Sequence, residues 1–182
     1  LVTDMTDKAI KWIGQQKALT PDQPFFIYFA PGATHAPHHV FKEWADKYKG
    51  KFDQGWDQQR AATYARQKQL GVIPADCALT PRPKEIPSWD EMPEAMKPVL
   101  RREMEVYAGY MEFTDHHVGR IVDFLEKLKI LDDTLIYYIC GDNGASAEGQ
   151  EYGLFNETLS LNGMLEDPNT VLKNIDLIGT EK

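Results

Sequence analysis

Two short runs of consecutive apolar and aromatic residues limit most strongly what this chain can fold into. Phe25–Phe29 lies between Pro24 and Pro31, and Leu135–Cys140 leads directly into the sequence Gly141-Asp142-Asn143-Gly144. Continuous apolar runs of this length, bounded by turn-forming residues, are typical of β-strands that are buried on both faces. The sequence therefore predicts at least two internal strands of a sheet.

A helical pattern precedes each of these runs. Residues 3–17 place Met5, Ala9, Trp12 and Ile13 on one helical face. After Pro98 a longer helix is expected, with one apolar face formed by Met104, Tyr107, Ala108, Met111, Val118, Ile121, Val122, Leu125 and Leu128. Helix followed by strand, repeated, predicts an α/β fold in which the polar loops after the two strands could open at the same edge of a sheet.

Residues 42–98 have a different character. They are rich in Lys, Gln, Asp and Pro, with scattered aromatic residues such as Trp44 and Trp56. Prolines between Pro81 and Pro98 exclude a long regular element there. We expect short helices and loops that cross the surface as an insertion close to the functional site. The tail from Ala145 onward predicts no more than short helices.

Charge and cysteine content exclude several classes of function. The formal net charge is -8 across 182 residues, without a Lys/Arg stripe, which argues against a nucleic-acid partner. The two cysteines, Cys77 and Cys140, indicate neither a disulfide framework nor a zinc motif, and Cys140 is expected to be buried and inert. No apolar stretch is long enough for a transmembrane segment. The chain begins with Leu1 and not with Met, so we expect a processed or truncated piece.

Asp142 and Asn143 are the candidate metal ligands. A carboxylate beside a carboxamide at a strand end offers hard oxygen donors to a divalent cation, and the flanking glycines allow the backbone to turn there. The alternative is that Asp-Asn-Gly simply reverses the chain, because Asn-Gly is also a strong turn signal.

His35 is the candidate catalytic residue. It follows the first apolar run in Thr34-His35-Ala36-Pro37, where the proline restricts the loop. A histidine beside an anionic substrate can bind the anion or protonate a departing oxygen, and the alternative is a loop histidine exposed to water. His38 and His39 are neighbours that point opposite ways and do not predict a metal pair. His116 and His117, adjacent on a helix, are expected at solvated or core-edge positions.

In order and spacing, four features together resemble the arylsulfatases of the sulfatase family: residues 24–29, the His35-x-Pro37 loop, Gly119-Arg120-Ile121-Val122 and the strand ending at Gly141-Asp142-Asn143-Gly144. The resemblance covers roughly residues 3–155. It implies a partial alkaline-phosphatase-like α/β fold with a mixed sheet flanked by helices, a small-molecule sulfate ester as substrate and a periplasmic or extracellular location. It further implies a divalent metal, calcium, held by Asp142 and Asn143 as half of the ligand set, with His35 acting on the sulfate and the leaving oxygen.

Departures from the family pattern set the limits of this interpretation. The family's formylglycine nucleophile comes from a Cys-x-Pro-x-Arg or Ser-x-Pro-x-Arg motif, and the sequence at Cys77 lacks this spacing. We therefore expect 1–182 to be a partial sulfatase catalytic domain without the N-terminal nucleophile region and the C-terminal region, inactive alone and completed by the remainder of the parent domain. A phosphodiesterase or phosphonate hydrolase of the same superfamily, and a noncatalytic binding domain, are the alternatives.

Overall fold

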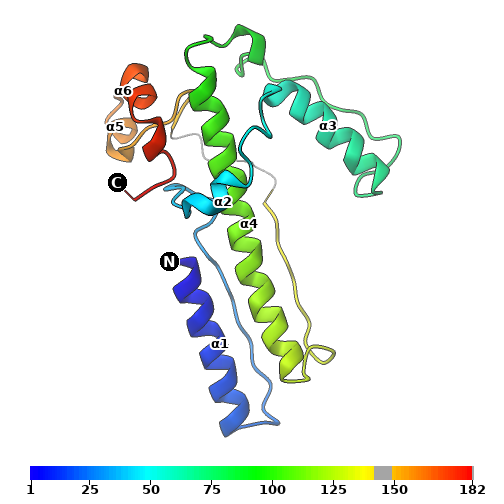
Figure 1. The fold of residues 1–182 in the computed structure, drawn as a ribbon. Helices are drawn as coiled ribbons and strands as arrows, with labels where there is room; N and C mark the ends of the chain where they lie inside the picture. The colour runs from blue at the N-terminus through cyan, green and yellow to red at the C-terminus, as the bar shows by residue number, and fades with distance from the viewer. Residues whose placement is uncertain (142–148, 182) are drawn as a thin grey trace.

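The computed structural model describes residues 1–141 and 149–181, and in this part the regular structure is helical (Figure 1). Its elements in chain order are α1 (Val2–Leu19), α2 (Lys42–Asp46), α3 (Gly55–Gln69), the 3-10 helix η1 (Trp89–Glu91), α4 (Lys97–Lys127), α5 (Glu157–Leu161), α6 (Pro168–Lys173) and the 3-10 helix η2 (Ile175–Leu177).

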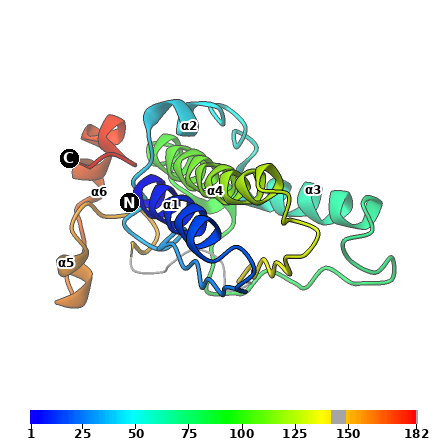
Figure 2. The same cartoon turned by 90° about the horizontal axis from the view of Figure 1, so that it is seen from below.

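Helix α4 is the central element, with 31 residues. Pro98 stands in its first turn, where a missing backbone N–H costs nothing, and the left-handed Lys129 (φ 58°) follows its end. Helices α1 and α2 pack against α4, whereas α3 projects away from it (Figures 1 and 2). The α2 contact depends on Gly109, because a Cβ at this position would lie 2.7 Å from the backbone of Ala45.

Three small apolar clusters share α4 as one wall. The first joins α1 to α4 through Val2, Tyr110 and Phe113. The second packs Trp89 and Met92 on Leu100, and the third packs Val171 of α6 on Met96 and Val99. The long helix was predicted correctly, but its buried face only in part: Leu125 is buried and Met104 packs on the second cluster. Met111, expected inside, is 50% exposed, whereas Val106, Tyr110 and Phe113 are buried.

The predicted mixed sheet is wrong for the described residues, which contain no β-strand. Residues 25–29 and 135–140 have no regular secondary structure, and no described segment pairs with them through a backbone ladder. Their side chains are largely in water, with exposures of 86% for Phe26 and Ile139 and 77% for Leu135. A continuous apolar run predicts burial, but a strand also needs a neighbour for its N–H and C=O groups, and the run itself does not specify that neighbour.

Two smaller expectations also need correction. Cys140 is exposed and not buried. His117, expected at a solvated or core-edge position, is buried with 4% exposure, while the adjacent His116 is exposed. His117 is covered because it faces α1, where its Nε2 lies 3.0 Å from Thr3 Oγ1.

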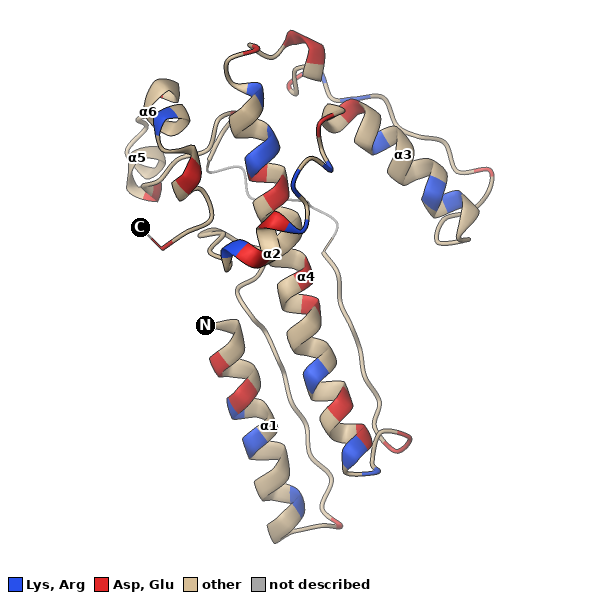
Figure 3. Ribbon diagram, viewed as in Figure 1, with Lys and Arg blue, Asp and Glu red and all other residues tan. Residues whose placement is uncertain are grey.

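Charges are interspersed along the helices. Figure 3 shows both signs of charge on α1 and α4, with Asp toward the start of α1 and Lys toward its end, and without a continuous basic face in the described part of the molecule. Among the helices described, none combines the length and apolar character that crossing a bilayer requires.

Candidate functional site

His35 lies in the loop that follows the first apolar run, as the sequence predicted. Its backbone N–H donates to the Gly32 carbonyl at 2.8 Å, which closes a turn, and its side chain is exposed. The imidazole Nδ1 lies 2.9 Å from the carbonyl oxygen of Ala36, and a carbonyl can only accept, so Nδ1 carries the proton. Nε2 is therefore the atom left to bind an anion or exchange a proton.

Helix α4 holds this loop in place through Tyr107. Thr34 Oγ1 donates to the Tyr107 hydroxyl at 2.9 Å, immediately before His35 in the chain. His38 Nε2 donates to the Thr34 carbonyl at 3.0 Å, and its ring packs edge-on against Tyr107 with 5.6 Å between centroids. The loop is thus anchored on both sides of His35.

His38 has a structural role in this arrangement. Burial lowers the pKa of His38, opposed by the hydrogen bond to Thr34 and reinforced by the nearby His35. A neutral His38 that donates from Nε2 to a carbonyl does not offer this nitrogen to a metal.

The second apolar run approaches the same region. Residues 24–30 and 135–141 both run back along the helices that precede them, toward the level of α2 (Figures 1 and 2). Tyr138 lies beside Asp115 of α4, and burial together with this carboxylate raises the pKa of its phenol. Gly141 follows Tyr138 by three extended residues, which span about 10 Å. This distance equals about two turns of α4, so Gly141 lies near the level of Tyr107, about two turns from Asp115.

Asp142 and Asn143, the predicted metal ligands, lie outside the described residues. Within residues 1–141 and 149–181, no group of three or more His, Cys, Asp or Glu side chains could hold a metal ion. An Asp and an Asn offer oxygen ligands suited to Ca²⁺, but they are two of the six to eight that this ion usually takes. The metal therefore stays a prediction.

Cys77, rejected as a nucleophile, lies in the loop after α3. Its carbonyl accepts a hydrogen bond from the Tyr64 hydroxyl, and its Sγ lies 3.8 Å from the Ala78 carbonyl oxygen. No described histidine or carboxylate activates the thiol through a hydrogen bond.

Sequence reasoning missed Tyr107 and Glu103 as part of this region. Tyr107 was assigned to the apolar face of the long helix, but its hydroxyl is the contact that fixes Thr34. Glu103, one turn earlier, packs its Oε1 against Gly153, and burial raises its pKa to about 8. Both contacts join residues distant in sequence, and helical spacing alone does not reveal them.

Comparison with known proteins agrees with the resemblance noted in the sequence. A model of the Sulfatase family matches residues 1–171. The chain is 37% identical over 140 residues to an uncharacterized sulfatase of Schizosaccharomyces pombe, covering 75% of this chain and 25% of that protein. It is 30% identical over 142 residues to an arylsulfatase of Klebsiella aerogenes, covering 78% of this chain and 30% of that protein.

The chain belongs to the sulfatase family. It spans between a quarter and a third of the length of these two relatives. The loop that carries His35 and the segment that leads to Asp142 both fall within the range that the family match covers.

Proposed function

We propose that this chain forms part of the catalytic domain of a sulfuric ester hydrolase of the arylsulfatase type. The observation that carries the proposal is the exposed His35, oriented through Nδ1 and anchored by Tyr107, in a chain of the sulfatase family. Its substrate is a small-molecule sulfate ester, and its location is periplasmic or extracellular.

In this proposal His35 acts at the sulfate ester. The Ala36 carbonyl holds the Nδ1 proton, so Nε2 is directed at solvent and substrate. A protonated Nε2 binds a sulfate oxygen and donates its proton to the leaving oxygen as the ester bond breaks. Thr34 and Tyr107 restrict the loop, which reduces the loss of freedom when the substrate binds.

Asp142 and Asn143 are proposed to bind a divalent metal, calcium. A bound Ca²⁺ would neutralise part of the sulfate charge and stabilise the charge that develops in the transition state. The nucleophile is proposed to be a formylglycine on another segment of a longer protein, because these 182 residues contain no Cys-x-Pro-x-Arg or Ser-x-Pro-x-Arg sequence. By this proposal, the 182 residues alone do not turn over an aryl sulfate.

The test uses the protein encoded by the complete reading frame and two substrates that differ in their leaving group. His35→Ala should lower kcat by roughly 10²- to 10⁴-fold for phenyl sulfate and by less for 4-nitrophenyl sulfate, whose phenolate leaves without a proton. His39→Ala, an exposed neighbour, is the control. Equal losses on both substrates would contradict the acid role, and a preference for bis-(4-nitrophenyl) phosphate would favour the phosphodiesterase alternative.

A further inference from the structure

A cavity of about 410 Å³ lies away from the His35 loop, between the segment before η1 and the residues before α5. It is lined by Trp56, Glu85, Ile86, Pro87, Met92, Gln150 and Glu151. Its volume is within the range of small-molecule sites, about 300–1,000 Å³. Nothing in the proposed sulfatase mechanism uses this cavity.

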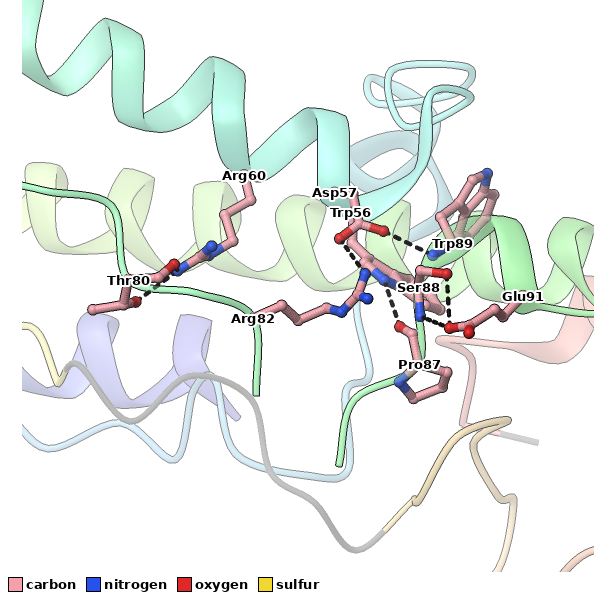
Figure 4. A network of polar contacts seen from close by, with 9 residues as sticks. All are labelled: Trp56, Asp57, Arg60, Thr80, Arg82, Pro87, Ser88, Trp89 and Glu91. Atoms are coloured by element: carbon pink, nitrogen blue, oxygen red, sulfur yellow. Dashed lines mark hydrogen bonds and ion pairs between the residues drawn. The ribbon is translucent and has the colours of Figure 1, made fainter. Parts of the chain in front are cut away.

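The aromatic wall of the cavity is held rigidly. The Trp56 indole N–H donates to the Pro87 carbonyl at 3.2 Å, and its ring meets Trp89 edge-on with 4.9 Å between centroids. Asp57 accepts from the Trp89 backbone N–H at 2.8 Å and pairs with Arg82 at 2.8 Å, as Figure 4 shows. The wall is therefore formed before any ligand arrives.

The other charged side chains of this network already have partners, so they are not available to bind a ligand in the cavity. Glu91 accepts from both the backbone N–H and the hydroxyl of Ser88, each at 2.7 Å, in a capping box (Figure 4). The Arg82 guanidinium is paired with Asp57 and is not among the lining residues. Neither the cations nor the acids of the network are free to bind a ligand.

The lining itself carries one sign of charge. Glu85 and Glu151 contribute two carboxylates from segments distant in sequence, and no Lys or Arg is among the residues that line the cavity. Neither carboxylate forms an ion pair within residues 1–141 and 149–181. An anion in this cavity would meet two like charges, whereas a cation would meet two opposite ones.

Trp56 adds a second attraction for a cation. In the described part of the chain, the cations that lie over an indole ring are Lys47 on Trp44, and Lys97 and Arg101 on Trp89. The ring of Trp56 has no such partner among them. An indole face attracts a cation, and Ile86, Pro87 and Met92 supply apolar contacts beside it.

We propose that this cavity binds an apolar organic cation, an aromatic or branched alkyl group bearing an ammonium. The apolar group packs on Ile86 and Met92, and the ammonium lies over Trp56 between Glu85 and Glu151. The site is independent of the proposed function, because neither His35 nor Asp142 takes part in it.

The experiment records the indole N–H resonances of the ¹⁵N-labelled chain during titration with benzyltrimethylammonium. Benzyl alcohol and phenylacetate are the neutral and anionic comparison ligands. We expect saturable shifts at Trp56 and not at the remote Trp12, with the cation binding tightest and phenylacetate weakest. Equal affinity for the cation and benzyl alcohol, the largest shift at Trp12, or no saturable binding would each overturn the proposal.

Two variants separate charge recognition from apolar contact. Glu85→Gln/Glu151→Gln changes only exposed side chains, so the fold should be unaffected, and it should weaken benzyltrimethylammonium binding roughly five- to tenfold. Glu126→Gln, an exposed glutamate at the far end of α4, is the matched control and should leave the affinity unchanged. Unchanged affinity in the double variant would overturn the proposal even if the cavity binds the ligand.

Discussion

Replacing Glu103 by glutamine should stabilise this protein at neutral and alkaline pH. The Glu103 carboxyl packs against Gly153, with no hydrogen bond or ion pair to another described residue, and burial raises its pKa from 4.5 to about 8. An acid with a raised pKa in the folded state takes up a proton on folding. Its contribution is most favourable below the unfolded pKa of 4.5 and is lost as the pH rises toward 8.

The magnitude follows from the difference between the two pKa values. At pH 7 the unfolded chain has lost this proton and the folded chain retains it, which costs on the order of 3 kcal/mol. The Glu103 side chain is incompletely buried, so we expect Glu103→Gln to raise the free energy of unfolding by about 1–2 kcal/mol. For a chain of this length, that raises Tm by roughly 2–8 °C.

Urea unfolding followed by circular dichroism at about pH 6 and about pH 8 tests this reasoning. The stability gain of Glu103→Gln should be larger at the higher pH, because the cost of keeping the wild-type carboxyl protonated grows across this interval. Glu126→Gln, an exposed substitution on the same helix, should show no such trend. A gain that is absent, or the same at both pH values, would refute the assignment of Glu103 as a buried and unpaired carboxyl.

Three further substitutions test other contacts. His117→Ala should lower the free energy of unfolding by roughly 1–3 kcal/mol. Burial and then Arg120 lower the pKa of His117, so the stabilisation by the neutral ring is present above pH 6.5 and is lost as the pH falls. A destabilisation by His117→Ala that does not shrink below pH 6.5 would contradict the neutral form. Gly109→Ala should lower the free energy of unfolding by on the order of 2–4 kcal/mol in thermal unfolding, because the Cβ of the new alanine would lie 2.7 Å from the Ala45 backbone. Wild-type stability of this variant would disprove the close approach. Asp57→Asn should lower the free energy of unfolding, measured in urea, by about 1–2 kcal/mol at neutral pH and by less near pH 3. The reason is that hydrogen bonds and charge lower the pKa of Asp57, so its carboxylate stabilises the fold only while it is ionised. A destabilisation that does not change with pH would exclude a charged carboxylate.

The helices were predictable because their signals are local. The pattern after Pro98 placed α4 correctly, and the residues between Pro81 and Met96 contain only the short η1, as the proline content indicated. The buried face of α4 was predictable only in part, because apolar residues occur on more than one side of it. The choice depends on where α1 and α2 pack, and Gly109 gives no apolar signal although it permits the α2 contact.

The strands were predicted from apolar content alone, and apolar content does not determine whether a segment pairs with a neighbouring strand. Residues 25–29 and 135–140 are as apolar as internal strands, yet a run that needs a partner does not identify it. His35 lies in a loop after the first apolar run although no sheet forms in the described residues, because a loop after an extended segment does not require a sheet. The Tyr107 anchor could not be foreseen, since it joins residues 73 positions apart.

A shared sulfatase site requires that His35 and position 142 lie close together, and paramagnetic broadening measures this proximity. A nitroxide label at Asp142→Cys, in a Cys77→Ser/Cys140→Ser background, broadens nearby proton resonances with an inverse sixth-power dependence on distance. If the site is shared, the imidazole resonances of His35 should broaden much more than those of His116, which lies further along α4 beside Trp44. Equal broadening of the two rings, or stronger broadening at His116, would contradict a shared sulfatase site.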